Sequence, residues 1–169
     1  EKLGLQQAMH KSGHSLMRQK IKQTAAPLGG EFSAHIFFKD RWFGFDDGMY
    51  AGARILELLT RQAGSCDEKF STFPQSFATE EIRLEVCEQD KFSLMEKILE
   101  EAQGMTGNKI LIDGLRLEFD DGWGLVRASN TSAALLFRFE DVTEQALQRI
   151  QSEFKALIQR ADNSIELNI

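Results

Sequence analysis

The chain has 169 residues, of which 42% are hydrophobic and 27% are charged, and its formal net charge is −6. This composition excludes a disordered segment, and the negative charge argues against a nucleic-acid partner. No run of about 18 apolar residues occurs, so we expect no membrane span and no membrane partner. Cys66 and Cys87 have no histidine at ligand spacing, which favours reduced thiols in a cytoplasmic protein over a disulfide framework or a zinc site.

The first 61 residues are expected to form two helices and a short strand. Apolar side chains recur at helical spacing in two segments, separated by the strand-like run Ile-Phe-Phe. The expected elements are a helix at 15–26, a strand at 36–38 and a helix from about 48 to 61. Ser15 is the predicted N-cap of the first helix, and Asp46 or Asp47 that of the second. The two aspartates also look like a metal pair, but a cap before Gly48 is the favoured interpretation.

Helical periodicity is lost over residues 62–80, where Gly, Ser, Asp and Pro are frequent. This segment is the best linker candidate in the chain. The expected division is a first domain at 1–66, a linker at 67–80 and a second domain at 81–169.

The second domain is expected to be a small α+β fold. Strand-like and helix-like segments follow one another in the order β-α-β-β-β-β-α, which predicts helices packed on one face of a mostly antiparallel sheet. The expected strands are 81–88, 109–112, 115–119, 124–127 and 133–140. One helix is expected from Asp90 to about Gln103 and a second after Thr143. In the first of these helices the side chains expected to face the core are Phe92, Met95, Ile98 and Leu99.

A polar segment, Arg-Ala-Ser-Asn-Thr at 127–131, lies between two predicted strands. It offers a guanidinium fork, two hydroxyls and an amide, a set of groups that suits a phosphate. Consecutive backbone N–H groups in such a turn can also form an anion-binding concavity. The alternative is an ordinary polar hairpin turn, which composition alone favours.

Two other polar groups are candidates for a site. Glu31, Ser33 and His35 alternate, so in an extended backbone they would point the same way and could hold sugar hydroxyls. Lys11 and His14 lie just before the first helix, where a cation could face an anion. For both groups the alternative is an exposed surface without a ligand.

These motifs resemble those of one family. The segments KSGH, GEFSAH and GWGLVRASNTSAALLFRFED are similar, in order and spacing, to the bacterial phosphomannomutase/phosphoglucomutase branch of the α-D-phosphohexomutase superfamily. The resemblance covers nearly the whole chain. It implies the later part of an α/β third domain, followed by the small α+β fourth domain. The Ser-Asn-Thr loop favours this branch over the phosphoglucosamine mutases, whose loop typically reads Ser-Gly-Thr.

The resemblance also implies roles for individual residues. His35 and His14 are candidates for proton transfer near the reacting centre. The substrate-binding residues implied are Glu31 and Ser33 at the sugar hydroxyls, Lys11 lining the active-site cleft, and Arg127, Ser129, Asn130 and Thr131 at the phosphate that is not transferred.

Two departures from the family pattern are present. Ala34 stands where the family has glycine, which could crowd the backbone. Ser132-Ala133 stands where the family usually has a proline after the Asn-Thr pair, so the loop is expected to be less rigid.

The family's phosphoserine segment, Ser-His-Asn-Pro, and its DGDGDR-like metal loop are absent from these 169 residues. We therefore expect the chain, which does not begin with Met, to be the C-terminal portion of a mutase and inactive alone. Mg²⁺ would be bound by the missing N-terminal domains, with no metal site in this chain. The implied partners are those domains and hexose phosphates, with hexose 1,6-bisphosphate as the intermediate. The alternatives are a mutase for amino sugars and a standalone module that binds sugar phosphates.

Overall fold

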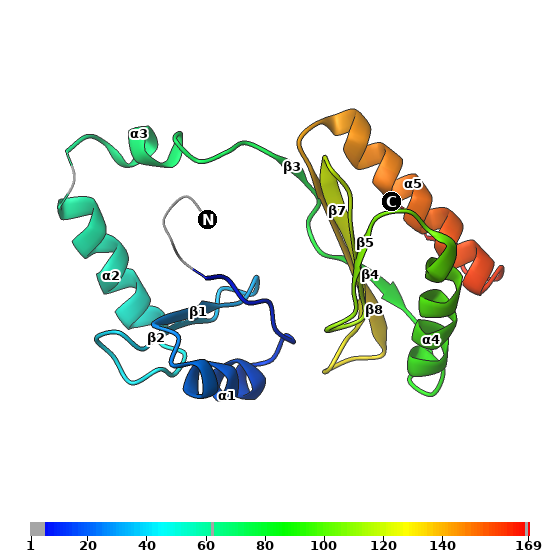
Figure 1. Cartoon of the computed structure of the whole chain (residues 1–169), viewed down its shortest axis with the longest axis horizontal. Helices are drawn as coiled ribbons and strands as arrows, with labels where there is room; N and C mark the ends of the chain where they lie inside the picture. The colour runs from blue at the N-terminus through cyan, green and yellow to red at the C-terminus, as the bar shows by residue number, and fades with distance from the viewer. Residues whose placement is uncertain (1–5, 62, 168) are drawn as a thin grey trace. The chain divides into compact units, whose positions relative to one another are not determined.

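The computed structural model describes residues 6–61, 63–167 and 169. They form two compact units, an N-terminal unit up to Pro74 and a C-terminal unit from Gln75 onward (Figure 1). The boundary between the units falls within the predicted linker. Among the described residues, no helix is both long enough and apolar enough to cross a bilayer.

The N-terminal unit combines three helices with a two-stranded sheet. Its elements are α1 (His14–Thr24), β1 (Leu28–Gly30), β2 (Ile36–Phe38), α2 (Gly48–Thr60) and α3 (Cys66–Phe70). β1 and β2 form an antiparallel hairpin. The strand predicted at 36–38 and the helix predicted from about 48 are confirmed. β1 was not predicted, because its two glycines indicate a break. A Cβ at Gly29 would lie 2.6 Å from Cδ1 of Ile21, so the glycine allows β1 to lie against α1.

Of the two N-caps predicted in this unit, one is confirmed and one is wrong. Asp47 is the N-cap of α2, because its Oδ1 accepts the N–H of Tyr50 at 2.9 Å. The Ser15 cap is wrong, since α1 begins at His14 and its N-cap is Gly13. Gly13 has φ 136°, a conformation that favours glycine, so the chain turns into the helix before it reaches Ser15.

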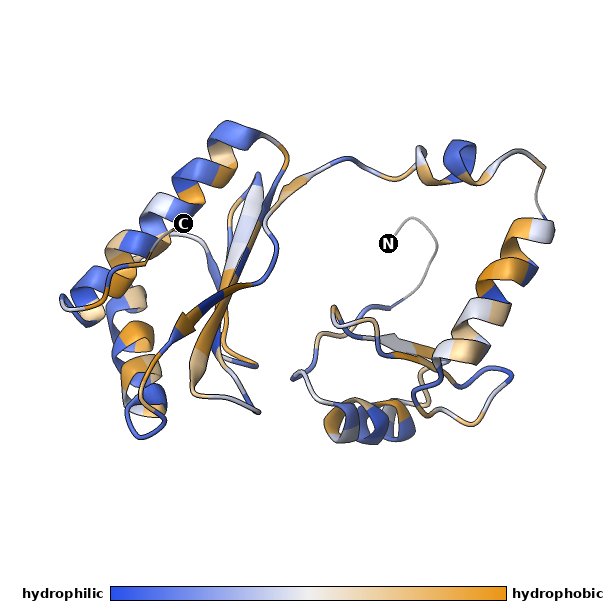
Figure 2. Cartoon of the chain, turned by 180° about the vertical axis from the view of Figure 1, so that it is seen from behind, coloured by the Kyte–Doolittle hydropathy of each residue, from blue (hydrophilic) through white to orange (hydrophobic). Residues whose placement is uncertain are grey.

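The apolar face predicted for α2 is present but largely exposed. Hydrophobic residues dominate the colouring of α2 in Figure 2, and the exposed fractions of Leu56 and Leu58 are 64% and 55%. An apolar surface of this kind usually marks contact with another part of a protein.

α3 lies in the segment where no element was expected. Ser65 and Glu68 form a capping box, in which the Ser65 hydroxyl accepts the N–H of Glu68 at 3.2 Å and Glu68 Oε2 accepts the N–H of Ser65 at 2.7 Å. The Ser-x-x-Glu spacing that predicts such a box is visible in the sequence. Periodicity missed α3 because the helix is only 5 residues long.

The C-terminal unit is a six-stranded antiparallel sheet with α4 and α5 on one face (Figure 1). The strand order is β3-β8-β7-β6-β5, and β4 also pairs with β8. This arrangement confirms the predicted α+β fold. The strands are β3 (Phe77–Ala78), β4 (Ile82–Glu85), β5 (Asn108–Ile110), β6 (Leu115–Glu118), β7 (Gly122–Ala128) and β8 (Ala134–Asp141). The helices are α4 (Lys91–Glu101), a 3₁₀ turn (Ala102–Gly104) and α5 (Glu144–Ala161).

The core of this unit lies between the sheet and the two helices. Phe139 of β8 and Phe154 of α5 are fully buried and meet edge to face, with ring centroids 5.2 Å apart. Thr143 caps α5 as predicted, since its side chain accepts the N–H of Ala146. Both helices and the core therefore lie on the same face of the sheet.

The prediction that Phe92 is buried is wrong, because its side chain is 63% exposed. The buried stripe of α4 runs through Lys91, Leu94, Met95 and Ile98. Phe92 is one residue, or about 100° of rotation, away from the start of that stripe. Lys91, a cation, occupies the buried position instead.

Candidate functional site

Each unit holds one group of the predicted residues, and the group in the N-terminal unit centres on the loop between β1 and β2. Glu31 Oε2 accepts hydrogen bonds from the Ser12 hydroxyl at 3.0 Å and the Gly13 N–H at 3.1 Å. These two hydrogen bonds join the first residue of this loop to the KSGH segment. The other carboxylate oxygen, Oε1, is buried and has no hydrogen-bond partner among the described residues. A buried acceptor in that state indicates a partner that is not part of the described chain.

The loop is not extended, so the alternation argument for Glu31, Ser33 and His35 is wrong. β1 ends at Gly30 and β2 begins at Ile36, and the residues between them turn back on themselves. The Glu31 N–H donates to the carbonyl of His35 at 3.0 Å, which closes the turn. Ser33 is exposed on it.

His35 is held by Asp46, a contact that the sequence analysis did not foresee. Nδ1 of His35 lies 2.6 Å from Asp46 Oδ2, and Asp46 Oδ1 accepts the N–H of Ile36 at 3.1 Å. An ionised carboxylate only accepts, so Nδ1 carries the proton of this contact, and Nε2 is the nitrogen with a lone pair when the ring is neutral. The His35 side chain is 47% exposed, which leaves the ring accessible to a ligand.

Lys11 and His14 flank Ser12 and Gly13, the two residues that donate to Glu31. His14 is the first residue of α1, and its ring packs against that of Phe37 with centroids 5.5 Å apart. Lys11 is exposed and precedes Ser12, the donor to Glu31. Both histidines are exposed, but His14 contacts an aromatic ring and His35 contacts a carboxylate.

Ala34 occupies the left-handed region, with φ 64°. Glycine adopts this conformation without the penalty of roughly 1–2 kcal/mol that other residues incur, which explains why a glycine suits the position. We expect Ala34→Gly to stabilise the N-terminal unit by about 0.5–1 kcal/mol, after the greater freedom of glycine in the unfolded chain is subtracted. Urea unfolding followed by amide signals of this unit checks the value. The control Ala26→Gly, at a position without positive φ, should destabilise, and a loss of stability in both variants would contradict the argument.

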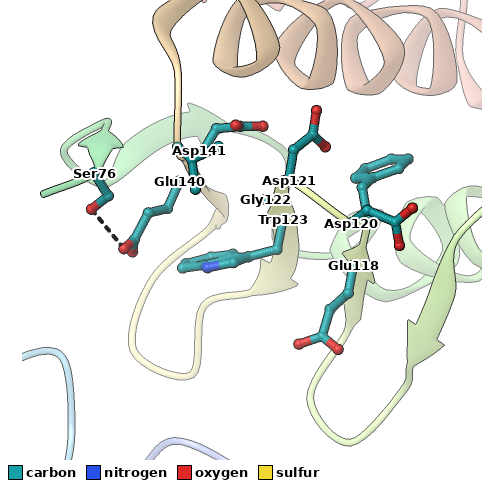
Figure 3. Close-up of a pocket in the computed structure, with 10 residues that line it drawn as sticks. Ser76, Glu118, Asp120, Asp121, Gly122, Trp123, Glu140 and Asp141 are labelled. Carbon is teal, nitrogen blue, oxygen red and sulfur yellow. Dashed lines mark hydrogen bonds between the residues drawn. The ribbon is translucent and has the colours of Figure 1, made fainter. Parts of the chain in front are cut away.

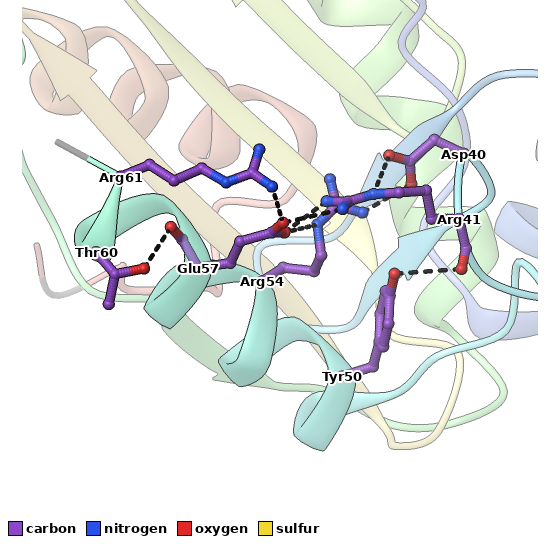
Figure 4. Close-up of polar contacts among 7 residues, drawn as sticks. All are labelled: Asp40, Arg41, Tyr50, Arg54, Glu57, Thr60 and Arg61. Atoms are coloured by element: carbon purple, nitrogen blue, oxygen red, sulfur yellow. Dashed lines mark hydrogen bonds and ion pairs between the residues drawn. The ribbon is translucent and has the colours of Figure 1, made fainter.

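A network of ion pairs fixes the loop that carries Asp46 onto α2 (Figure 4). Arg54 Nη1 donates to Asp40 Oδ1 at 2.9 Å, and Arg41 Nη1 donates to Glu57 Oε1 at 3.0 Å. Both pairs connect the segment after β2 with α2. The hydrogen bond from Arg54 lowers the pKa of Asp40, and that from Arg41 lowers the pKa of Glu57.

This network predicts a pH dependence. The ordinary pKa values of Asp40 and Glu57 are 3.8 and 4.5, and both are lower in the folded chain. Above those ordinary pKa values the two ion pairs therefore contribute fully to the stability of the folded chain. This contribution is lost as the pH falls through the lowered pKa values of the folded chain. Carboxyl carbon NMR should show both titrations below the ordinary values, with Arg54→Ala raising the midpoint of Asp40. An Asp40 midpoint that does not move in this variant would contradict the assignment of cause.

The group in the C-terminal unit is the loop between β7 and β8. Arg127 lies near the end of β7, and its neighbour Val126 is fully buried in the core. Because side chains alternate along a strand, Arg127 points to the face of the sheet opposite the core. Its Nη1 lies 4.0 Å from Asp113 Oδ2, and its side chain is 17% exposed. This contact connects the guanidinium to the segment between β5 and β6.

The three polar residues after Arg127 are not equivalent. Ser129 is buried, and its Oγ accepts from the Thr131 N–H at 3.3 Å and from the Ser132 hydroxyl at 2.7 Å. Asn130 and Thr131 are exposed at the tip of the loop. Ser129 therefore shapes the loop, and its two neighbours present their side chains outward.

Lys91, which the sequence analysis did not single out, lies directly under this loop. Its Nζ donates to the carbonyl oxygens of Ser129 and Ser132, each at 3.0 Å. Lys91 begins α4, so the helix and the loop are joined through one ammonium group.

A pocket of about 310 Å³ lies at the other end of the β7–β8 hairpin (Figure 3). Its lining includes the carboxylates of Glu118, Asp120, Asp121, Glu140 and Asp141. This excess of negative charge does not suit a phosphate. None of the residues predicted to bind substrate lines it.

Comparison with known proteins assigns both units. Residues 1–77 match the family model "Phosphoglucomutase/phosphomannomutase, alpha/beta/alpha domain III", and residues 81–157 match the model of the C-terminal domain of the same family. The phosphomannomutase/phosphoglucomutase of Pseudomonas aeruginosa PAO1 is 46% identical over 157 residues, which are 93% of this chain and 34% of that protein.

Two further relatives agree. The phosphoglucomutase of Neisseria gonorrhoeae is 46% identical over 153 residues, covering 89% of this chain and 33% of that protein. A crystal structure of a phosphoglucomutase/phosphomannomutase family protein from Burkholderia thailandensis superposes with a TM-score of 0.86 at 42% identity, covering 95% of this chain and 34% of that one. The chain thus spans about a third of the length of these relatives. It belongs to the phosphoglucomutase/phosphomannomutase family, and it corresponds to the C-terminal part of such a protein, with residues of domain III followed by the C-terminal domain.

Proposed function

We propose that this chain supplies the sugar- and phosphate-binding residues of a phosphohexomutase that interconverts hexose 1-phosphates and hexose 6-phosphates of mannose and glucose. The observation that carries the proposal is the contact of Glu31 with Ser12 and Gly13. It joins two motifs of the family in one place and leaves one buried carboxylate oxygen without a partner among the described residues. A sugar hydroxyl is a donor of the kind that this oxygen lacks.

The proposed reaction is a phosphoryl exchange. A phosphoserine in the N-terminal domains gives its phosphoryl group to the free hydroxyl of a hexose phosphate, which forms a hexose 1,6-bisphosphate. The intermediate turns over and returns its other phosphoryl group to the serine. A site that binds the sugar phosphate in two opposite orientations must hold one phosphate firmly. It must also form hydrogen bonds only with hydroxyl groups that are present in both orientations. Arg127 with Ser129, Asn130 and Thr131 would do the first, and Glu31 with Ser33 the second, with Lys11 lining the same cleft.

His35 is the residue that we assign to proton transfer. The attacking hydroxyl must lose a proton as its oxygen bonds to phosphorus, and the accessible Nε2 of His35 can accept it. Asp46 holds the ring so that Nε2 is the basic nitrogen. His14 is the weaker candidate, because its ring packs on Phe37.

Mg²⁺ would offset charge at the phosphoserine and is assigned to the N-terminal domains. The aspartate pair of this chain does not fit the ion, since its carboxylates are already engaged. Asp46 contacts His35 and Ile36, while Asp47 accepts from Tyr50 and from Trp42 Nε1.

Steady-state kinetics of the enzyme that contains this chain tests the proposal. Glucose 1-phosphate and mannose 1-phosphate should both be converted to their 6-phosphates, and glucosamine 1-phosphate should be a poor substrate. A preference for glucosamine 1-phosphate would establish the amino-sugar alternative. No turnover of any of the three would favour a module that only binds sugar phosphates.

A further inference from the structure

Lys91 is a buried cation with no role in the proposal so far. Its side chain is 3% exposed, whereas lysine is almost never fully buried unless it is paired. Its position in the apolar stripe of α4 would suit a leucine or a methionine. A charge at such a position needs an explanation from its contacts.

The contacts use the full donor capacity of the ammonium group. Nζ donates to Glu88 Oε1 at 2.8 Å and to the carbonyl oxygens of Ser129 and Ser132 at 3.0 Å each. These two carbonyls lie at either end of the exposed pair Asn130 and Thr131. Lys91 therefore holds both ends of the loop tip from below.

The two hydrogen bonds from Lys91 to the loop, here called the clamp, set the direction of the loop's peptide groups. In a planar trans peptide the carbonyl and the following N–H point in opposite directions, and no peptide bond of the described chain is cis. With the carbonyls of Ser129 and Ser132 directed at Lys91, the N–H groups of Asn130 and Ala133 are directed to the opposite side. Backbone N–H groups on one side of a turn are donors of the kind that can bind an anion.

The clamp also places a positive charge beneath the loop. Its counter-charge within the described chain is Glu88, whose side chain is 62% exposed and therefore partly screened by water. The ammonium itself is shielded from solvent, so its field acts on the loop with less screening.

We propose that Lys91 is the positioning residue of the phosphate loop: it orients the backbone N–H groups of residues 130 and 133 toward a phosphate monoester and adds charge beneath them. The inference rests on the proposed function, in which this loop binds the phosphate that is not transferred. Lys91 does not touch the phosphate and acts through the loop.

Titration of the 169-residue chain with inorganic phosphate and with glucose 1-phosphate, followed by amide NMR, tests the inference through three variants. Lys91→Met keeps the side-chain length and removes the charge and the donors, and it should weaken binding by roughly ten- to a hundred-fold. Lys91→Arg keeps the charge and should recover part of the loss. Glu88→Gln removes the counter-charge and should tighten binding by about two- to five-fold at low salt, an effect that fades at high salt.

The sign of the Glu88→Gln effect separates this role from a structural one. If Lys91 and Glu88 only stabilise the loop, both variants weaken binding and the inference fails, and Glu88→Gln remains informative even if Lys91→Met does not fold. Wild-type binding at the loop with unchanged affinity in all variants would overturn the inference and leave the proposed function standing. No binding of either ligand by the wild-type loop would overturn both.

Discussion

Replacing His35 by alanine in the enzyme that contains this chain should lower kcat by about 10²–10⁴-fold, the usual contribution of a general acid–base group. The expected change in KM is small, because the proposal assigns proton transfer to His35 and substrate binding to other residues. Steady-state kinetics with glucose 1-phosphate measures both parameters.

Two variants serve as controls for His35. His14→Ala removes a ring that packs on Phe37, so its effect should be mainly on stability. Asp46→Asn keeps His35 but removes the carboxylate that fixes its tautomer, and kcat should fall by less than in His35→Ala. If His14→Ala loses more kcat than His35→Ala, the assignment of the proton to His35 is wrong.

Arg127→Ala should lower kcat/KM of the same enzyme by about ten- to a hundred-fold. Hydrogen bonds to a charged group contribute roughly 1.5–3 kcal/mol, and about 1.4 kcal/mol corresponds to a factor of ten. Arg127 lies in β7 just before the loop, and its guanidinium can form a bidentate fork with phosphate oxygens. Kinetics with glucose 1-phosphate and mannose 1-phosphate should show the same relative loss, since both carry the same phosphate.

The matched control for Arg127 is Arg149→Ala. Arg149 pairs with Asp121 at 2.7 Å, at the other end of the β7–β8 hairpin. This variant removes one guanidinium from the same unit and should leave kcat/KM within a factor of about two, because a surface ion pair contributes little. Equal losses in both variants would point to a general electrostatic effect, and unchanged kinetics in Arg127→Ala would remove Arg127 from the site.

The sequence predicted those elements whose signals are local and repeated. α5 has a cap at Thr143 and an apolar stripe long enough to define its phase, and β8 is a strand of 8 residues that begins with four apolar, buried ones. Short or glycine-rich elements were missed, because β1 depends on a close approach between Gly29 and Ile21 that is visible only after folding. Phe92 was misplaced because composition indicates which residues are apolar but not the rotation of a helix about its axis.

The sequence predicted the motifs of the candidate site, but not the contacts that hold those motifs in place. GEFSAH, KSGH and the Ser-Asn-Thr loop were found from residue types and from the family resemblance. Asp46 and Lys91 were missed because their contacts join residues that are 11 and 38 positions apart. Neither has a motif of its own, and an aspartate before a helix or a lysine within one is ordinary until the fold supplies its partner.

The central claim is that two segments of this chain, Glu31–His35 and Arg127–Thr131, bind a sugar phosphate. Amide NMR of the chain during addition of glucose 1-phosphate tests it most directly, with free glucose and inorganic phosphate as controls. Our account predicts shifts at both segments with glucose 1-phosphate and shifts at the second segment with phosphate alone. No shift at either segment, at ligand concentrations that saturate such enzymes, would contradict it.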